Sequence, residues 1–332
     1  MNTTEEKQMK NPLDYKSEKR LLFQFAVPSI IAMLVGSLYN IVDQFFIGHS
    51  VGELGNAATN ISFPLSISCV AIALLFGIGG ASAFNISMGA GEKKKAVYYL
   101  GNSAIMLFSC GVVLCVITLM FLEPLLRFFG SPNNVLDYAK TYTGIIAFGF
   151  PFLILTTGGG HLIRADGRPN VSMVCNLTGA ILNTFLDALF VFGLNMGMRG
   201  AALATIIGQV LSAIMVIWCL SHCKTVSVGK EHLRVRKKII SRIISLGTAP
   251  FSNQLAMMVV QIVMNKSLKY YGSISVYGEA VPIACAGIIT KVNQVFMSFV
   301  IGISQGLQPI TSFNYGAKKY KRVKTAYTFA IK

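Results

Sequence analysis

Long apolar stretches alternate with short polar ones along the whole chain. Eight of these stretches reach or exceed the ~20 residues that an α-helix needs to cross the hydrocarbon core of a bilayer. They predict spans at 21–48, 54–88, 96–122, 142–163, 171–194, 201–220, 243–268 and 281–313, and a ninth apolar stretch begins near Ala326. The even spacing, without the period-2 alternation of barrel strands, predicts an all-α polytopic membrane protein.

The composition supports this interpretation. Of the 332 residues 53% are apolar and only 13% are charged, whereas a soluble domain carries about 25% charged residues. An ordinary soluble protein and a disordered chain are therefore both excluded. The first 20 residues are polar, and the first apolar stretch is longer than the core of a cleavable signal peptide.

Basic residues gather in every second connecting segment, which predicts the topology. With the N-terminus in the cytoplasm, the inner segments hold 22 of the 29 Lys and Arg residues, and the outer segments hold five. The inner segments are 1–20, 89–95, 164–170, 221–242 and 314–325. Cytoplasmic loops carry such an excess of Lys and Arg. We therefore expect a cytoplasmic N-terminus, and basic loops that contact anionic lipid headgroups rather than nucleic acid.

The chain also repeats itself. Pro28 and Pro250 lie 222 residues apart in similar segments, and Gly89 and Gly316 lie 227 residues apart, each close to a Lys-rich segment. Six spans separate the copies, and an even number gives both copies the same direction, as in transporters built from parallel repeats.

This repeat predicts the division of the chain. We expect a cytoplasmic segment at 1–20, an N-lobe of six helices at 21–221, a basic cytoplasmic linker at 222–242 and the start of a C-lobe at 243–332. Two complete units would be longer than 332 residues. The expectation is thus one lobe and the first third of the next, which is a truncated two-lobe bundle.

Two acids, Asp43 and Asp187, lie inside apolar spans, and ionisable groups at that depth are costly and functional by default. Each belongs to one of three polar stripes. The stripes are Tyr39, Asn40 and Asp43 on the first span, Asn176, Asn183 and Asp187 on the fifth, and Thr205, Gln209 and Ser212 on the sixth. Any one stripe also fits plain interhelical packing. Three together, two of them with a carboxylate, favour a cavity that contains water.

The second copy keeps a polar stripe without the charge. Its members, Gln254, Gln261 and Asn265, have the same spacing as the fifth-span stripe, and Asn265 corresponds to Asp43. The titratable groups are thus concentrated in the first half, and the second stripe is expected to line the same cavity.

Four further residues leave alternatives open. Pro28 and Pro250 lie inside predicted helices, and each is either a plain kink or a hinge at which the helix bends. Lys291 within the eighth span either extends to the membrane surface or serves the substrate path. The role of Glu279, just before that span, stays open.

Motifs for enzyme chemistry are absent from the sequence. It contains no nucleotide-binding loop for ATP, no zinc-protease motif, no hydrolase nucleophile motif and no dinucleotide fingerprint. The seven cysteines form no CxxC pair, and most fit buried apolar positions. We expect neither an enzyme, nor a metal site, nor an organic cofactor.

Four segments resemble the multidrug and toxic compound extrusion (MATE) family, most of all its bacterial MepA-like members. They are SLYNIVDQFFIG at 37–48, HLIRADGRPN at 161–170, NTFLDALFVFGLNMGMRGAALAT at 183–205 and QGLQPITSFNYGAKKYKRV at 305–323. The resemblance covers essentially the whole chain.

The resemblance implies twelve helices in two lobes that rock between outward- and inward-open states. It implies a cation site in the first lobe formed by Asp43, Asn183 and Asp187, with Tyr39 and Thr205 beside them and Pro28 as the bending proline. We therefore expect a secondary multidrug exporter of the bacterial inner membrane, monomeric when full length. It would export lipophilic cationic drugs in exchange for H⁺ or Na⁺.

Rival functions remain at this stage. A lipid-linked sugar flippase of the same wider superfamily is the main alternative. It should need cationic residues in the cavity to hold a diphosphate, and the sequence places no Lys or Arg in the middle of a first-lobe span. A membrane-embedded enzyme or a channel finds less support, because neither paired catalytic groups nor a charged ring is visible.

Overall fold

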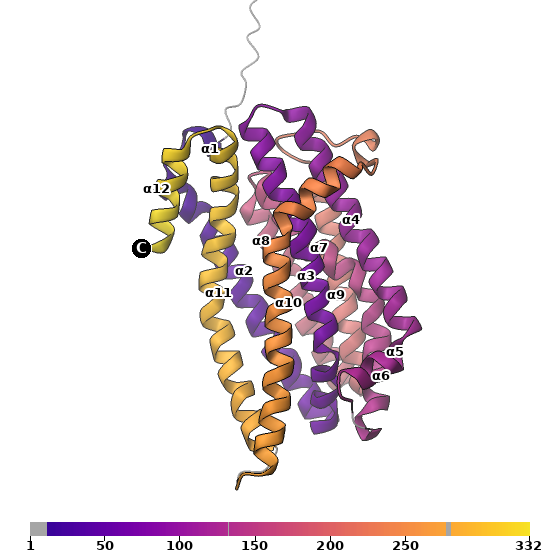
Figure 1. The fold of residues 1–332 in the computed structure, drawn as a ribbon. Coiled ribbons are helices and arrows are strands. Elements are labelled where there is room, and N and C mark those ends of the chain that lie inside the picture. The colour runs from indigo at the N-terminus through magenta and orange to yellow at the C-terminus, as the bar shows by residue number, and fades with distance from the viewer. Residues whose placement is uncertain (1–11, 132, 277–279) are drawn as a thin grey trace, which may run out of the picture.

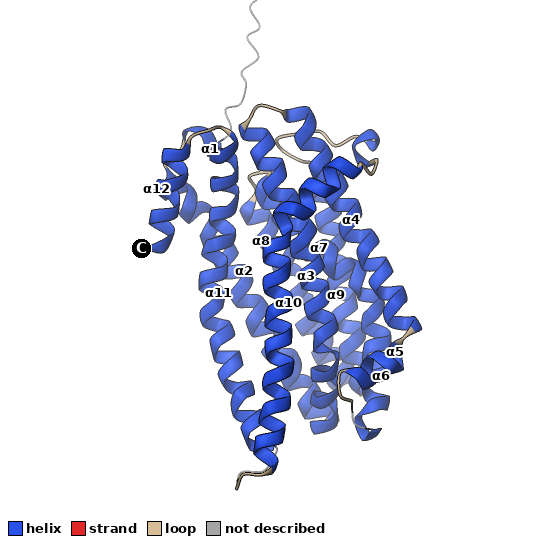
Figure 2. Cartoon of the chain, viewed as in Figure 1, coloured by secondary structure: helices blue, strands red, loops and turns tan. Residues whose placement is uncertain are grey.

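The computed structural model describes residues 12–131, 133–276 and 280–332, and within these ranges it leaves a few side chains undescribed, among them Asn265 and Lys291. Every regular element in these ranges is helical (Figure 2). The α-helices are α1 (Pro12–Tyr15), α2 (Glu18–Val51), α3 (Glu53–Gly89), α4 (Lys93–Met120), α5 (Leu122–Phe128), α6 (Asn133–Ile146), α7 (Phe150–Ala165), α8 (Pro169–Asp187), α9 (Gly197–Ser221), α10 (Lys237–Ser273), α11 (Ala280–Gly316) and α12 (Tyr320–Ile331). Three short helical turns join them: η1 (Ala147–Gly149), η2 (Ala188–Gly193) and η3 (Lys230–Leu233).

Seven helices in the described part are long and apolar enough to cross a membrane, which confirms the predicted fold class. They are Glu18–His49, Leu54–Gly89, Lys93–Met120, Val135–Ala165, Pro169–Gly193, Gly197–Ser221 and Lys237–Ser273. The eighth predicted span falls on α11, where the side chains of 281–285 lie outside the description.

Several boundaries differ from the predicted spans; α10, for example, runs from Lys237 to Ser273 instead of over 243–268. The third span ends at Met120, and α5 follows as a separate short helix. The fourth begins at Asn133 instead of Tyr142, because its first turns are polar on one face and Lys140 there pairs with Glu123 of α5. The last helix begins at Tyr320 instead of Ala326, and its Arg322 pairs with Glu18 at 2.6 Å. Hydropathy alone misses such turns because they carry polar and charged residues.

The core of the bundle forms around α3, α4, α6, α7 and α9. Phe84 and Leu100, from α3 and α4, are almost fully buried, as are Phe150 and Ile154 of α7. Close approach depends on small residues, because a Cβ on Gly77 would come within 2.6 Å of Gly158 Cα. Aligned small residues allow helices to pack closely without a hydrophobic driving force.

The two sequence copies exchange partners in space. Helix α11 packs along α2, and α10 packs along α3, so each copy's first helix lies against the other copy's second helix. In Figure 1 the α3–α4 turn, the segment between α9 and α10, and the α11–α12 turn lie at the same end of the bundle. The charge pattern of the sequence assigns these three segments to one side of the membrane. The two sequence copies, α2–α3 and α10–α11, run in the same direction.

Two side chains of α4, Asn102 and Tyr98, attach the segment between α9 and α10 to the bundle. Asn102 of α4 donates to the carbonyl oxygens of His232 and Arg234 and accepts from the Arg236 amide, at 2.9–3.2 Å. The Arg236 guanidinium lies 3.8 Å from the centre of the Tyr98 ring. A cation over an aromatic face is attracted by its quadrupole, so this part of the predicted linker packs on α4.

Candidate functional site

Asp43 of α2 and Asp187 at the end of α8 lie side by side inside the bundle. Asp187 is fully buried and Asp43 is 9% exposed. Their carboxyl groups are within hydrogen-bonding reach of each other, a bond that forms when one of them carries a proton. Asp43 Oδ1 and both carboxyl oxygens of Asp187 have no hydrogen-bond partner among the described residues. No ion pair joins either acid to a Lys or Arg side chain in that part of the chain. The pair is therefore open to a proton or a bound cation.

Helices α8 and α9 approach closely at the level of the cavity, which aligns their polar stripes. A Cβ on Gly208 would come within 2.7 Å of the Gly179 carbonyl oxygen, so only glycine fits there. One turn further, Asn183 Nδ2 donates to Thr205 Oγ1 at 3.3 Å. Asn183 Oδ1 is buried and has no hydrogen-bond partner among the described residues. The predicted stripe positions on the fifth and sixth spans are thus brought together.

The backbone changes geometry directly after Asp187. Residues Ala188–Gly193 form a π-helical turn, and the Leu194 amide donates to the Leu189 carbonyl at 3.0 Å. Such turns are rare in helices and often mark functional sites. The sequence gives no signal for this turn, because π geometry has no clear composition signature.

Two tyrosines flank the acids. Tyr39, one turn before Asp43 on α2, lies close to Asp43 and Asp187 and within hydrogen-bonding reach of the Thr205 hydroxyl. Tyr142 of α6 is 8% exposed and also faces both acids. Tyr142 is not predicted from the sequence, because it lies at the edge of a predicted span and belongs to no polar stripe.

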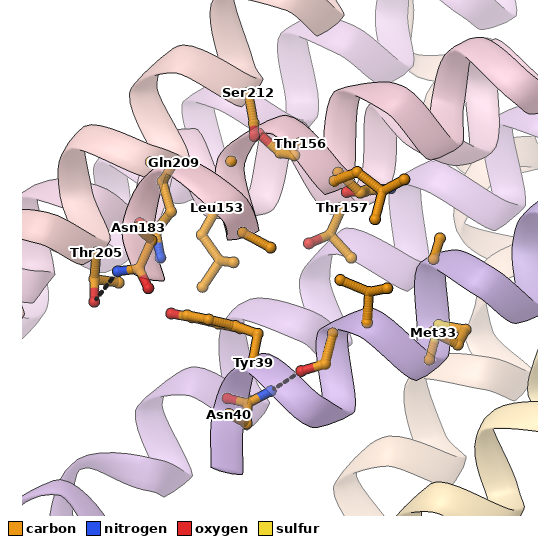
Figure 3. Close-up of a pocket in the computed structure, with 18 of the residues that line it drawn as sticks. Met33, Tyr39, Asn40, Leu153, Thr156, Thr157, Asn183, Thr205, Gln209 and Ser212 are labelled. Carbon is orange, nitrogen blue, oxygen red and sulfur yellow. Dashed lines mark hydrogen bonds between the residues drawn. The ribbon is translucent and has the colours of Figure 1, made fainter. Parts of the chain in front are cut away.

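A cavity of about 290 Å³ opens beside this cluster, between α2, α7, α8 and α9. Tyr39 points from α2 toward Asn183 and Thr205, and Asn40 turns away to the Gly36 carbonyl at 2.7 Å (Figure 3). Leu153, Thr156 and Thr157 contribute the α7 wall, and Gln305 is the lining residue from α11. The acids themselves are not lining residues, whereas Tyr39, Asn183 and Thr205 are.

The other predicted residues divide into two groups. Asn176, Gln209 and Ser212 line the cavity together with Asn40. The described cavity has no lining residue from α10, so Gln254 and Gln261 lie outside it. The side chain of Asn265 lies outside the described residues, as do Glu279 and the side chain of Lys291. Helices α2 and α10 run on through Pro28 and Pro250, and their bending stays a prediction.

The opposite end of the cavity holds a buried arginine that the sequence analysis treated as part of a loop. Arg164, on the last turn of α7, lines the cavity and is 4% exposed. It donates to Ser172 Oγ at 2.9 Å and contacts His161 Nδ1 at 3.0 Å. Arg164 is not in the middle of a span, so the prediction about mid-span basic residues is unaffected, but α7 continues to Ala165 and brings this arginine to the cavity.

A bundle of membrane-spanning helices around a polar cavity, with a buried acid pair beside it, defines an integral membrane transporter. The MatE family model matches residues 28–189 and 251–332. The chain belongs to the MatE family, the multidrug and toxic compound extrusion transporters, which are not enzymes.

Relatives support the same assignment. The chain is 27% identical over 307 residues to the multidrug export protein MepA of Staphylococcus haemolyticus, which covers 92% of this chain and 66% of that protein. The chain thus spans about two thirds of the length of this curated relative.

Solved structures share the fold. A MATE-family multidrug resistance transporter of the MOP superfamily in an outward-facing conformation matches with a TM-score of 0.88 and 24% identity. A MOP superfamily transporter from Pyrococcus furiosus, described as having a binding pocket of reverse polarity, matches with the same score and identity. Each alignment covers 96% of this chain and 70% of the other.

Proposed function

We propose that the protein is a secondary active exporter of lipophilic cationic compounds in a bacterial cytoplasmic membrane. It exchanges them for H⁺ or Na⁺ by alternating access between the two sides. The observation that carries the proposal is the acid pair, Asp43 and Asp187, buried side by side with unpaired oxygens. The predicted N-lobe, 21–221, holds this pair and nearly all of the cavity wall.

The coupling follows from competition for the same negative charge. Two neighbouring carboxylates shielded from water repel each other unless a proton or a cation lies between them. A cationic drug in the cavity is attracted while the pair is ionised, and uptake of the coupling ion weakens that attraction. Each ligand therefore lowers the affinity for the other, which is the reciprocal coupling an antiporter needs.

The cavity has the composition that such substrates require. Ala32, Met33, Val35 and Leu153 give apolar contact, and Tyr39 contributes an aromatic face. Polar groups are few and lie at defined positions, as in other small-molecule sites. Asn183 and Thr205 form a polar part of the cavity wall.

The gradient of the coupling ion provides the energy. Exchange of one H⁺ or Na⁺ for one monovalent cation moves no net charge, so the membrane potential does no net work on it. Each tenfold gradient of the coupling ion releases about 1.4 kcal/mol and sustains an equal, tenfold gradient of the exported cation. Oxygen ligands suit Na⁺ as well as a proton, and Asp43, Asn183 and Asp187 together offer four unpaired oxygen atoms.

The test is efflux of a fluorescent cation, such as ethidium, from proteoliposomes with an imposed pH gradient or an imposed Na⁺ gradient. We expect Asp43→Asn and Asp187→Asn to insert normally and to lose gradient-driven efflux. Asn keeps the shape of a protonated acid but cannot release a proton. Asp137→Asn, an exposed acid on α6, is the matched control. Wild-type rates and pH dependence in both cavity variants would exclude the acids as the coupling groups.

A lipid-linked sugar flippase can no longer be rejected for lack of a basic residue, since Arg164 lines the cavity. A single arginine contributes one charge, whereas a diphosphate carries at least two. The family assignment and the acid pair favour the drug exporter.

A further inference from the structure

The end of the cavity that holds Arg164 carries a positive charge that no described acid neutralises. Arg164 is 4% exposed and its neighbour His161 is 2% exposed, and both line the cavity. The hydrogen bonds of the guanidinium go to neutral groups, Ser172 Oγ and His161 Nδ1, and its Nε has no partner in the described part of the chain. Buried charges in proteins are normally paired with an opposite charge. The geometry therefore lacks an anion.

The nearest acid in sequence is committed elsewhere. Asp166 pairs with Arg168 at 2.7 Å, and its oxygens accept from the Lys224 and Thr225 amides at 2.8 and 3.0 Å. Asp43 and Asp187 lie close to Tyr39, and neither is a lining residue of the cavity. The charges near the cavity thus have opposite signs, negative close to Tyr39 and positive at Arg164.

The arginine is held in place for binding. Ser172 Oγ accepts from Arg164 Nη1 and donates to the Gly160 carbonyl at 2.9 Å, which fixes its orientation. If His161 Nδ1 accepts from Arg164, the proton of the neutral ring resides on Nε2, which makes Nε2 a second donor. Arginine matches the planar geometry of a carboxylate better than lysine does.

We propose that Arg164 and His161 form a binding site for the carboxylate of a zwitterionic substrate, whose cationic group faces the acid pair. This inference rests on the proposed export function, because it assigns the second end of the same cavity. One guanidinium neutralises one carboxylate, and a cavity of about 290 Å³ suits a single small aromatic molecule.

The test compares two dyes that differ in one group. Tetramethylrhodamine carries a free carboxylate, and its methyl ester carries only the cation. Binding of each is measured by fluorescence anisotropy with the protein in lipid nanodiscs, after subtraction of empty nanodiscs. We expect Arg164→Gln to weaken binding of the acid by roughly 10- to 100-fold, because a charge-assisted bond is lost. Binding of the ester should change less than about twofold.

Two more variants complete the test. Ser172→Ala keeps the charge of Arg164 but removes the hydrogen bond that holds the guanidinium. It should therefore weaken binding of the carboxylate dye about three- to tenfold and leave binding of the methyl ester unchanged. Arg199→Gln removes an exposed arginine from α9 and should alter neither dye.

Each outcome has one meaning. Weaker binding of the carboxylate dye alone in Arg164→Gln supports the carboxylate site. If Arg164→Gln does not fold, the same selective loss of binding in Ser172→Ala supports it. Equal loss of both dyes, or no loss of either, assigns Arg164 a structural role and overturns the inference. If the wild-type protein binds the ester but not the acid, the carboxylate site alone fails. If it binds neither dye, the proposed cation site fails as well.

Discussion

Gly89 of α3 and Gly316 of α11 each lie against the backbone of the helix that carries the other. A Cβ atom on Gly89 would come within 2.0 Å of the Phe313 carbonyl oxygen, and one on Gly316 would come within 2.0 Å of the Ile86 carbonyl oxygen. Both corresponding pairs of residues are 227 positions apart. The contact is therefore reproduced when the two sequence copies are exchanged, and the repeat is a two-fold relationship in space at this crossing.

This contact predicts that neither glycine tolerates a methyl group. We expect Gly89→Ala and Gly316→Ala each to destabilise the protein by about 1–3 kcal/mol, because backbone rather than a flexible side chain must move. The measurement is thermal unfolding in detergent, followed by size-exclusion chromatography of a fluorescent fusion.

Gly144→Ala is the matched control, since its new methyl group would meet Leu122 at an ordinary 3.6 Å. Alanine also favours helix over glycine. Equal melting temperatures for all three variants would show that α3 and α11 do not pack as closely as described.

Much of this fold is readable from hydropathy, because membrane helices must satisfy their backbone internally and therefore appear as long apolar runs. The polar stripe of Asn176, Asn183 and Asp187 was equally readable, since a 3.6-residue period places these positions on one face. In the structure, Asn183 on this face donates to Thr205 of α9.

Other features depend on tertiary contacts and left no pattern in the sequence. Arg164 looked like a loop residue because basic residues cluster at membrane surfaces, yet α7 extends past it and encloses it. Tyr142 becomes a neighbour of the acids only through the packing of α6. The stripe on α10 has the right period, but no lining residue of the described cavity comes from that helix. Periodicity identifies a face, and the fold decides what the face meets.

The topology is testable at Ser227, an exposed residue in the segment between α9 and α10. We expect Ser227→Cys in intact cells to resist an impermeant maleimide, and to react once the membrane is opened, because the positive-inside pattern places this segment in the cytoplasm. The nearby native thiol gives little background: burial, and secondarily the charge of Asp166, raise the pKa of Cys223 to about 12. Since the thiolate is the reactive form, that thiol reacts slowly near neutral pH.

Wild-type protein treated in the same way measures the remaining background. Labelling of Ser227→Cys by the external reagent in intact cells would reverse the predicted orientation of every helix.

Asp166 predicts a structural role that is distinct from transport. Its buried carboxylate accepts from the Lys224 and Thr225 amides and pairs with Arg168. We expect Asp166→Asn to destabilise the protein by about 3–5 kcal/mol, because it leaves a partly buried arginine without its counter-charge. Thermal unfolding measures the loss. Glu92→Gln breaks an exposed pair with Lys95 and should cost less than about 1 kcal/mol; an equal effect of both variants would contradict the structural role of Asp166.

Asn183 lines the cavity one turn before Asp187 on α8, which predicts a partial defect instead of a complete one. Asn183→Ala removes the hydrogen bond to Thr205 but leaves both carboxyl groups. We expect efflux of ethidium to fall about three- to tenfold, in line with the loss of one hydrogen bond. The pH dependence should remain, because the titrating groups are still present.

Asn170→Ala, an exposed amide on the first turn of the same helix, should transport at the wild-type rate. Initial efflux rates across a series of imposed pH gradients test this, at matched protein levels. If Asn183→Ala abolished the pH dependence as completely as Asp187→Asn, Asn183 would have to be counted among the groups that bind the coupling ion.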